Sequence, residues 1–228
     1  MSFPAMIFAA GFGTRMGELT ERLPKPLIEV AGKPLLNYAI DVLLEADINS
    51  IVVNAHYHSE QIKRHLASSN IKVSLEYPHI LDTGGGLKAA LPKLAANTVI
   101  TQNADIIWVG PNPVKTLIAA WYPERMDSLM MCIPMEKART RKEAGDYSIA
   151  KDGHVIQGRD YIFSGLQIMK TDCLYEIKKN SFSLKVMWDK MVMAKRLFAL
   201  KYQGIWCDVG YPEGIEIAEA TLIDNHNV

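Results

Sequence analysis

The chain is poor in cysteine, has no excess of positive charge and lacks a targeting segment, and each of these shortages excludes a class of protein. The three cysteines, Cys132, Cys173 and Cys207, lie far apart in 228 residues and form no C-x-x-C pair, which argues against a disulfide framework and against a zinc site. Lys plus Arg equals Asp plus Glu at 25 each, so we expect no nucleic-acid partner and no membrane surface. The expected partner is a small molecule.

The N-terminal segment M-S-F-P-A-M-I-F-A-A-G-F-G is apolar but has no basic region, and its glycines come too early for a signal peptide or a membrane span. We therefore expect a cytoplasmic protein. The last predicted helix has an apolar face that suits either a core or a dimer surface, so a monomer and a homodimer both remain open.

Apolar runs that alternate with amphipathic segments predict an α/β fold. Strands are expected over residues 5–10, 50–55, 72–78 and 97–106, and helices over 34–47, 59–69 and the stretch after the glycine run at 84–86. This alternation favours a Rossmann-like, mixed but mostly parallel sheet flanked by helices. After about residue 135 short strands and turns replace it, with a helix around 185–197 and a closing helix to about 224. We expect one domain over 1–228, with a nucleotide-binding part at about 1–110 and a smaller substrate-binding lobe at about 111–228.

The segment A-A-G-F-G-T-R-M-G at residues 9–17 follows the first predicted strand. A dinucleotide-binding fingerprint would need a glycine where Met16 stands, together with an acidic residue about twenty positions later, and neither is present. A Walker loop would need G-x-x-x-x-G-K-[ST], which does not occur. There remain a glycine loop suited to phosphates, a bidentate phosphate ligand in Arg15, and Lys25 between two prolines. A plain strand-to-helix turn with solvated basic residues is the alternative.

The string A-A-G-F-G-T-R-M…P-K-P-L…G-K-P-L resembles the signature of the sugar-1-phosphate nucleotidyltransferases. Further matches are V-V-N-A-H, L-D-T-G-G-G, Q-N-A-D, G-D-Y-S-I, F-S-G-L and W-C-D-V-G. The combination of N-A-H, D-T-G-G-G and W-C-D-V-G looks most like the N-acetylmuramate 1-phosphate uridylyltransferases. The resemblance implies a reaction in which a sugar 1-phosphate attacks the α-phosphorus of a nucleoside triphosphate and pyrophosphate leaves.

The resemblance also implies roles for individual residues. Gly11, Gly13 and Thr14 would present donors to the triphosphate, Arg15 would hold the departing phosphates, and Lys25 would act at the reacting centre. Asp105 and Asp208 come from distant segments and would share one Mg²⁺, with Asp105 also counted as catalytic. Alone, an aspartate at a strand end is often only a helix cap.

The base and the sugar phosphate would bind residues of other segments. Thr83, Gly84 and Gly85 resemble the base-recognition segment of the family, with Asn54 and His56 near the base and ribose; the alternative is a flexible turn that caps the next helix. For the sugar phosphate, Asn103, Gly145, Asp146 and Gly165 match residues that line the acceptor pocket of the family. The E-K-P tripeptide that many relatives carry in this lobe is missing, so the hexose contacts made there need another source.

UTP with N-acetylmuramic acid 1-phosphate is the substrate pair that we expect. Two alternatives keep the fold and change the substrates: GTP with mannose 1-phosphate, or CTP with a small phosphorylated acceptor. A third, a catalytically silent nucleotide-sugar sensor, is opposed by the intact set of Arg15, Lys25, Asp105 and Asp208.

Overall fold

The computed structural model describes residues 3–141 and 143–226. The strands are β1 (Ala5–Phe8), β2 (Glu29–Val30), β3 (Lys33–Pro34), β4 (Ile51–Ala55), β5 (Lys72–Leu75), β6 (Thr98–Asn103), β7 (Ile106–Val109), β8 (Ser128–Pro134), β9 (Tyr147–Ile149), β10 (Val155–Lys170), β11 (Leu197–Lys201) and β12 (Ile205–Asp208). The α-helices are α1 (Leu35–Leu44), α2 (Ser59–Leu66), α3 (Asp82–Leu94), α4 (Pro113–Ala120), α5 (Lys185–Met193) and α6 (Glu213–His226). Short 3-10 helices at Thr14–Thr20 and Lys25–Leu27 follow β1.

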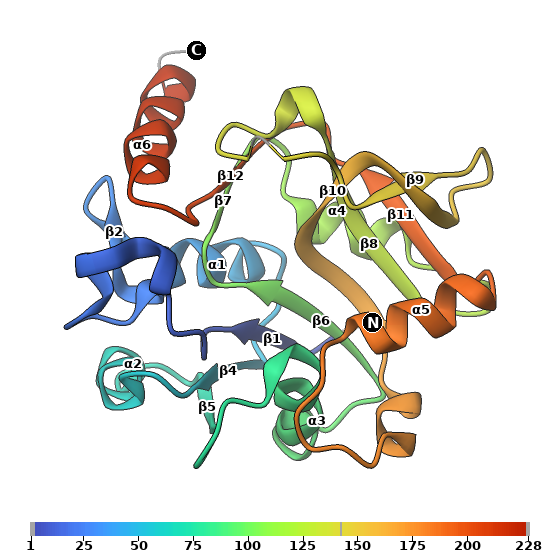
Figure 1. Ribbon diagram of the computed structural model, residues 1–228, viewed down its shortest axis with the longest axis horizontal. Helices are drawn as coiled ribbons and strands as arrows, with labels where there is room; N and C mark the ends of the chain where they lie inside the picture. Colours follow the sequence, from blue (N-terminus) through green and yellow to red (C-terminus); the bar gives the residue numbers. More distant parts are fainter. Residues whose placement is uncertain (1–2, 142, 227–228) are drawn as a thin grey trace.

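A central eight-stranded sheet runs through the molecule in the order β11-β8-β10-β6-β1-β4-β5, with β9 paired to β10 (Figure 1). The strands β6, β1, β4 and β5 are parallel to one another, whereas β10 is antiparallel to both β6 and β8. The carboxyl ends of β1, β4 and β6 therefore meet at one edge, where open α/β sheets bind their ligands. The mixed, mostly parallel sheet predicted from the sequence is confirmed.

The two faces of the sheet bury separate apolar clusters because side chains alternate along each strand. In β1, Ala5 and Ile7 lie in the cluster that contains the apolar residues of α1, α2 and α4. Met6 lies in the cluster on the other face, with the apolar residues of α3 and α5. The sheet is thus covered by helices on both faces (Figure 1).

The strands β7 and β12 form a separate antiparallel pair, in which Asp208 is opposite Ile106. A third apolar cluster joins this pair to α6 and to the loop after β1, through Ile107, Cys207, Ala218 and Met16. This pairing places the end of β12 beside the turn that follows β6. It is the reason why two segments about a hundred residues apart reach one site.

Some elements differ from the sequence expectation. The helix predicted over 185–197 ends at Met193, and Leu197 begins β11; Lys195 lies between them with a φ of 54°, which ends a helix sharply. The glycine run at 84–86 lies inside α3 rather than ahead of it. The two parts of the predicted single domain both contribute strands to the central sheet, since β8 to β11 extend the sheet that β1, β4, β5 and β6 begin. No helix in residues 3–141 and 143–226 has the length and apolar character needed to cross a membrane.

Candidate active site

The loop after β1 is shaped by two glycines in the left-handed region and by one buried side chain. Gly13 has a φ of 67° and Gly17 a φ of 58°, which a residue with a side chain adopts only at a cost. The N–H of Met16 donates to the carbonyl oxygen of Gly13 at 2.9 Å, and its side chain is only 1% exposed. Met16, the residue that breaks the dinucleotide fingerprint, therefore anchors the loop in the third apolar cluster.

The same loop positions Lys25. The hydroxyl of Thr20 donates to the carbonyl oxygens of Gly13 and Gly17, each at 3.1 Å. A Cβ on Gly13 would lie 2.9 Å from the Cβ of Lys25 and 2.9 Å from Thr20 Cγ2. The glycine thus lets the loop close on the P-K-P segment, and Lys25 becomes buried.

Lys25 and two carboxylates lie together at the end of β6. Lys25 Nζ is 2.5 Å from Asp105 Oδ2, and the N–H of Val209 donates to the carbonyl oxygen of Asp105, which draws the neighbouring Asp208 close. Burial raises the pKa of Asp208 to about 6, and the Asp105 carboxylate adds to this increase while Lys25 and Arg15 oppose it. The two carboxylates therefore repel each other even with cations beside them, as a pair of metal ligands does.

Arg15 projects from the loop toward the end of β12. Its guanidinium carbon lies 5.0 Å from the ring centroid of Tyr211, and a Cβ on Gly210 would be 3.5 Å from Arg15 Nη1 and 3.4 Å from Asp208 Oδ1. Hydrogen bonding to Tyr211 is the largest influence that raises the pKa of Arg15; partial burial opposes it and Asp208 reinforces it. Arg15 is thus a permanent cation within reach of the carboxylates.

Two adjoining cavities open on this group. The first, of about 390 Å³, is bordered by six of the predicted site residues: Gly11, Arg15, Asn54, Thr83, Asn103 and Asp105. The second, of about 320 Å³, is bordered by another overlapping six: Gly11, Gly13, Thr14, Arg15, Lys25 and Asp105. Because Gly11, Arg15 and Asp105 border both, the cavities meet at the charged group, and a ligand could pass from one into the other.

Asn54 is held at the end of β4 by contacts at both ends of its side chain. Its Oδ1 accepts from the N–H of Ala9 at 2.7 Å, and its Nδ2 donates to Glu76 Oε1 at 2.7 Å. His56 Nδ1 lies 2.8 Å from the carbonyl oxygen of Glu76, and its ring packs edge-on against Phe12. Asn54 borders the first cavity, and His56 contacts Glu76, which also borders it; the polar atoms named here are engaged in contacts within the fold.

The glycines of α3 let the segment around Phe182 pack closely against the helix. The N–H groups of Gly84 and Gly85 both donate to the carbonyl oxygen of Phe182, at 2.9 and 3.0 Å. A Cβ on Gly85 would lie 2.1 Å from the carbonyl oxygen of Asn180, and one on Gly84 would lie 2.4 Å from the Phe182 ring. Of the predicted base-recognition segment, only Thr83 borders the first cavity, and its hydroxyl accepts from the N–H of Leu184.

The predicted sugar-phosphate residues fall into two groups. Asn103 borders the first cavity, and Gly165, with a φ of 85° at an irregularity of β10, packs against it so closely that a Cβ would lie 2.6 Å from Asn103 Nδ2. Gly145 and Asp146 lie farther along the lobe. Both Asp146 oxygens accept from Arg141, at 2.8 and 3.1 Å, and the N–H of Phe163 donates to Oδ2.

The structure adds residues that the sequence analysis missed. Glu76 is 3% exposed and binds both Asn54 and the N–H of Leu81. Tyr211 lies beside Arg15, and Arg141 binds both oxygens of Asp146. The sequence shows the glutamate of E-Y-P and the tyrosine directly after W-C-D-V-G, but only the tertiary contacts show that these two residues lie at the candidate site.

Comparisons with known proteins agree with this geometry. Residues 5–165 match a family described as the MobA-like NTP transferase domain. The chain is 34% identical, over 96% of its length and 97% of the relative, to N-acetylmuramate alpha-1-phosphate uridylyltransferase of Caulobacter vibrioides. It is 29% identical to a mannose-1-phosphate guanyltransferase of Gibberella zeae, over 91% of this chain and 61% of that one. HddC from Yersinia pseudotuberculosis, solved with GMP-PN, has a TM-score of 0.77 at 22% identity over 96% of this chain and 99% of that chain, which shows the fold. The resemblance inferred from the motifs is confirmed.

Proposed function

The chain belongs to the MobA-like NTP transferase domain family, and we propose that it joins a nucleoside triphosphate to a sugar 1-phosphate and releases pyrophosphate. The observation that carries this proposal is the charged group at the meeting point of the two cavities. Arg15 and Lys25 supply positive charge there, Asp105 and Asp208 supply carboxylates, and Gly11 borders both spaces. A triphosphate that bridges the cavities would place its α-phosphorus at this group.

In the proposed reaction an oxygen of the sugar 1-phosphate attacks the α-phosphorus and forms a new P–O bond. The bond from the α-phosphorus to the oxygen that bridges to the β-phosphorus breaks, and its electron pair leaves with pyrophosphate. No side chain becomes covalently attached, so the protein contributes positioning and charge neutralisation. Arg15 binds the departing phosphates, Gly13 and Thr14 donate to the triphosphate, and Lys25 stabilises charge that builds at the α-phosphoryl group.

Asp105 and Asp208 are suited to hold a Mg²⁺. The fit rests on the donor set: two carboxylates from distant segments lie together at the charged group, and burial and then the Asp105 carboxylate raise the pKa of Asp208. Within the described residues no cluster of three or more His, Cys, Asp and Glu side chains forms, and Mg²⁺ characteristically takes one or two carboxylates together with substrate phosphates and water. When bound, the ion supplies charge neutralisation to the phosphates.

UTP and N-acetylmuramic acid 1-phosphate are the proposed substrates. The relative from Caulobacter vibrioides supports this pair because it is similar over nearly the full length of both chains. The base is assigned to the 390 Å³ cavity, near Asn54 and Thr83; His56, Gly84 and Gly85 would support the cavity wall. The sugar phosphate is assigned to the side of Asn103 and Gly165, toward Gly145 and Asp146.

GTP with mannose 1-phosphate is the second candidate pair, favoured by the relative from Gibberella zeae. It ranks lower because that similarity covers only 61% of the relative. The three free cysteines and the need for a nucleoside triphosphate favour a cytoplasmic protein, and we keep both the monomer and the homodimer as proposals.

Pyrophosphate release with each nucleoside triphosphate and a panel of sugar 1-phosphates, in the presence of Mg²⁺, tests the proposal. Turnover is expected with UTP and N-acetylmuramic acid 1-phosphate, and turnover only with GTP and mannose 1-phosphate would select the second pair. Asp105→Asn should lower kcat far more than nucleotide affinity, because a metal contact matters most where transition-state charge develops. No turnover with any pair would overturn the proposed function.

A further inference from the structure

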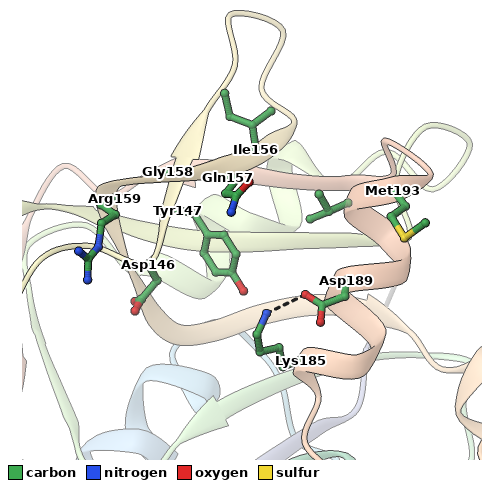
Figure 2. A pocket seen from close by; sticks show the side chains of 10 residues that line it. Asp146, Tyr147, Ile156, Gln157, Gly158, Arg159, Lys185, Asp189 and Met193 are labelled. Carbon is green, nitrogen blue, oxygen red and sulfur yellow. Dashed lines mark hydrogen bonds and ion pairs between the residues drawn. The ribbon is translucent and has the colours of Figure 1, made fainter.

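A third cavity, of about 570 Å³, lies in the lobe between the β9–β10 hairpin and α5. Figure 2 shows Asp146 and Arg159 toward one end, the ion pair of Lys185 and Asp189 toward the other, and Tyr147 between them. The cavity is therefore lined by charged and polar groups together with the apolar Ile156, Val192 and Met193, on the same lobe to which the sugar phosphate is assigned.

An irregularity in β10 places Arg159 in this cavity. The pairing with β9 jumps from Ile156 opposite Ser148 to Tyr161 opposite Tyr147, so residues 157–160 form an outward bulge. The bulge is held at close quarters: a Cβ on Gly158 would lie 2.5 Å from the Cβ of Ser148, and Ser148 Oγ donates to Asp160 Oδ2 at 2.5 Å. Bulges of this kind re-aim side chains beside functional sites.

Gly145 fixes the bulge from the other side. Its N–H donates to the carbonyl oxygen of Arg159 at 3.1 Å, and a Cβ on Gly145 would lie 2.7 Å from that same oxygen. The presence of a glycine at motif position 145 is thus explained by packing, because only a glycine lets the backbone of Arg159 approach so closely. The chain lacks an E-K-P tripeptide in this lobe, and the bulge occupies the stretch of β10 ahead of Gly165.

Asp146, Arg159, Lys185 and Asp189 line the cavity, and Arg159 differs from the other three in its pairing. Asp146 is ion-paired with Arg141, and Asp189 with Lys185. Among residues 3–141 and 143–226, no acidic side chain lies within ion-pair distance of Arg159. Tyr147 is neutral near pH 7, because burial and then Asp146 raise its pKa to about 12, so its O–H can donate. Among the described residues the cavity thus offers one cation without an ion-pair partner, Arg159, and one neutral donor, Tyr147.

Hydrogen bonds tie a wall of the cavity to the segment that carries Asp208. The N–H of Asp208 donates to Thr140 Oγ1 at 2.7 Å, and the next residue in the chain, Arg141, binds Asp146, which borders the cavity. An acceptor whose 1-phosphate lies near Asp208 would extend its sugar ring along this line toward Asp146 and Arg159.

We propose that Arg159 binds a second anionic group of the acceptor, a carboxylate on the sugar, and so selects an acidic sugar 1-phosphate over its neutral counterpart. This inference rests on the proposed function. N-acetylmuramic acid carries a carboxylate on a lactyl ether, and N-acetylglucosamine is the same sugar without it. Arginine binds carboxylates through two parallel N–H donors, and Arg159 is the cation of the cavity that has no competing carboxylate.

The test is Arg159→Gln, assayed with N-acetylmuramic acid 1-phosphate and with N-acetylglucosamine 1-phosphate as substrates or competitive inhibitors. The KM for the acidic sugar should rise by about ten- to a hundredfold, the range for a hydrogen bond to a charged group, while the constant for the neutral sugar stays within twofold. Arg159→Lys should recover part of the loss. Arg159 is exposed, so the thermal unfolding midpoint should not change.

Lys151→Gln is the matched control, since Lys151 is an exposed cation on the same hairpin that does not border the cavity; it should leave both constants unchanged. Equal effects of Arg159→Gln on the acidic and the neutral sugar, or an effect on neither, would overturn the inference while the transferase activity stands. The inference would also be overturned if the wild-type protein used only neutral sugar 1-phosphates. A wild-type protein inactive with every pair would overturn the proposed function instead.

Discussion

The loop of residues 11–17 and the first turn of α3 each contain three glycines, and the glycines meet opposite surroundings. A Cβ on Gly11 or Gly17 would have no atom within 4 Å, whereas one on Gly84, Gly85 or Gly86 would lie within 2.4 Å of a neighbouring atom. Gly11 and Gly17 leave open space beside a charged site, while the third loop glycine, Gly13, packs on Lys25 and Thr20. The helix glycines bring the segment of Asn180 and Phe182 against α3.

This contrast extends to the charges around each run. The loop faces Lys25, Asp105 and Asp208, a group in which two carboxylates remain unfavourably close. The start of α3 faces the buried Glu76, whose oxygens are satisfied by Asn54 and by the N–H of Leu81. The loop region holds like charges close together at a cost in stability, which a bound ligand would offset. At the start of α3 the buried carboxylate has both oxygens hydrogen-bonded within the fold. Substitutions should therefore separate into losses of catalysis at the loop and losses of folding at the helix.

The largest expected effect is at Lys25. Lys25→Met keeps much of the buried volume and removes the charge, and kcat should fall by about 10² to 10³, as for loss of one transition-state donor. The KM for the nucleotide should change by only a few fold, because the role lies mainly in the transition state. Steady-state kinetics measures both. Lys33→Met, at an exposed lysine paired with Asp41, is the control, and wild-type rates for Lys25→Met would remove Lys25 from the site.

The second effect is on stability at the helix. Gly85→Ala forces a methyl group against the carbonyl oxygen of Asn180, and overpacking of this kind costs roughly 1–3 kcal/mol. Urea unfolding should show this loss, while the folded enzyme keeps its nucleotide KM within threefold. A large rise in KM with normal stability would mean instead that Gly85 contacts the base, as the motif resemblance alone implies.

The glycine run shows what sequence could and could not predict. The strand at 5–10, the helix at 34–47 and the polar residues at the ends of β1 and β6 follow from local periodicity, which is a property of neighbouring residues. The packing of Gly85 on Asn180 joins positions almost a hundred residues apart and leaves no local pattern. Asp105 and Asp208 are also about a hundred residues apart, and only the motif resemblance predicted that they lie together.

The third effect has the opposite sign. In metal-free protein Asp208→Asn should raise stability near pH 7, because the pKa of Asp208 is raised in the folded state from 3.8 to about 6. Below pH 4 the carboxyl is protonated in both the folded and the unfolded protein and costs no stability. As the pH rises through 6 the carboxyl ionises in the folded protein, and the folded state is destabilised. The gain should be on the order of 2 kcal/mol. Unfolding with EDTA at pH 4, 5.5 and 7 measures it.

Two outcomes of that experiment would contradict the assignment of Asp208. A difference between wild type and Asp208→Asn that does not change between pH 4 and 7 would mean that the carboxyl is not perturbed. Adding Mg²⁺ should stabilise the wild type and not the variant, since a ligand bound only by the folded state adds its binding free energy to stability. Equal stabilisation of both would place the ion elsewhere.

The smallest effect is at Gly11, and it separates the two uses of glycine most clearly. Gly11 has open space where a Cβ would be and a φ outside the left-handed region, so Gly11→Ala should keep or slightly raise stability. Because Gly11 borders both cavities, the methyl group would keep the triphosphate from the backbone, and the nucleotide KM should rise about tenfold, the equivalent of roughly 1.4 kcal/mol.

Gly17→Ala is the control with the opposite expectation. Its φ of 58° makes the substitution cost about 1–2 kcal/mol of stability, yet Gly17 borders neither cavity, so the nucleotide KM should not change. If both variants changed stability alone, the loop would be a structural turn, and the phosphates would have to bind without its backbone.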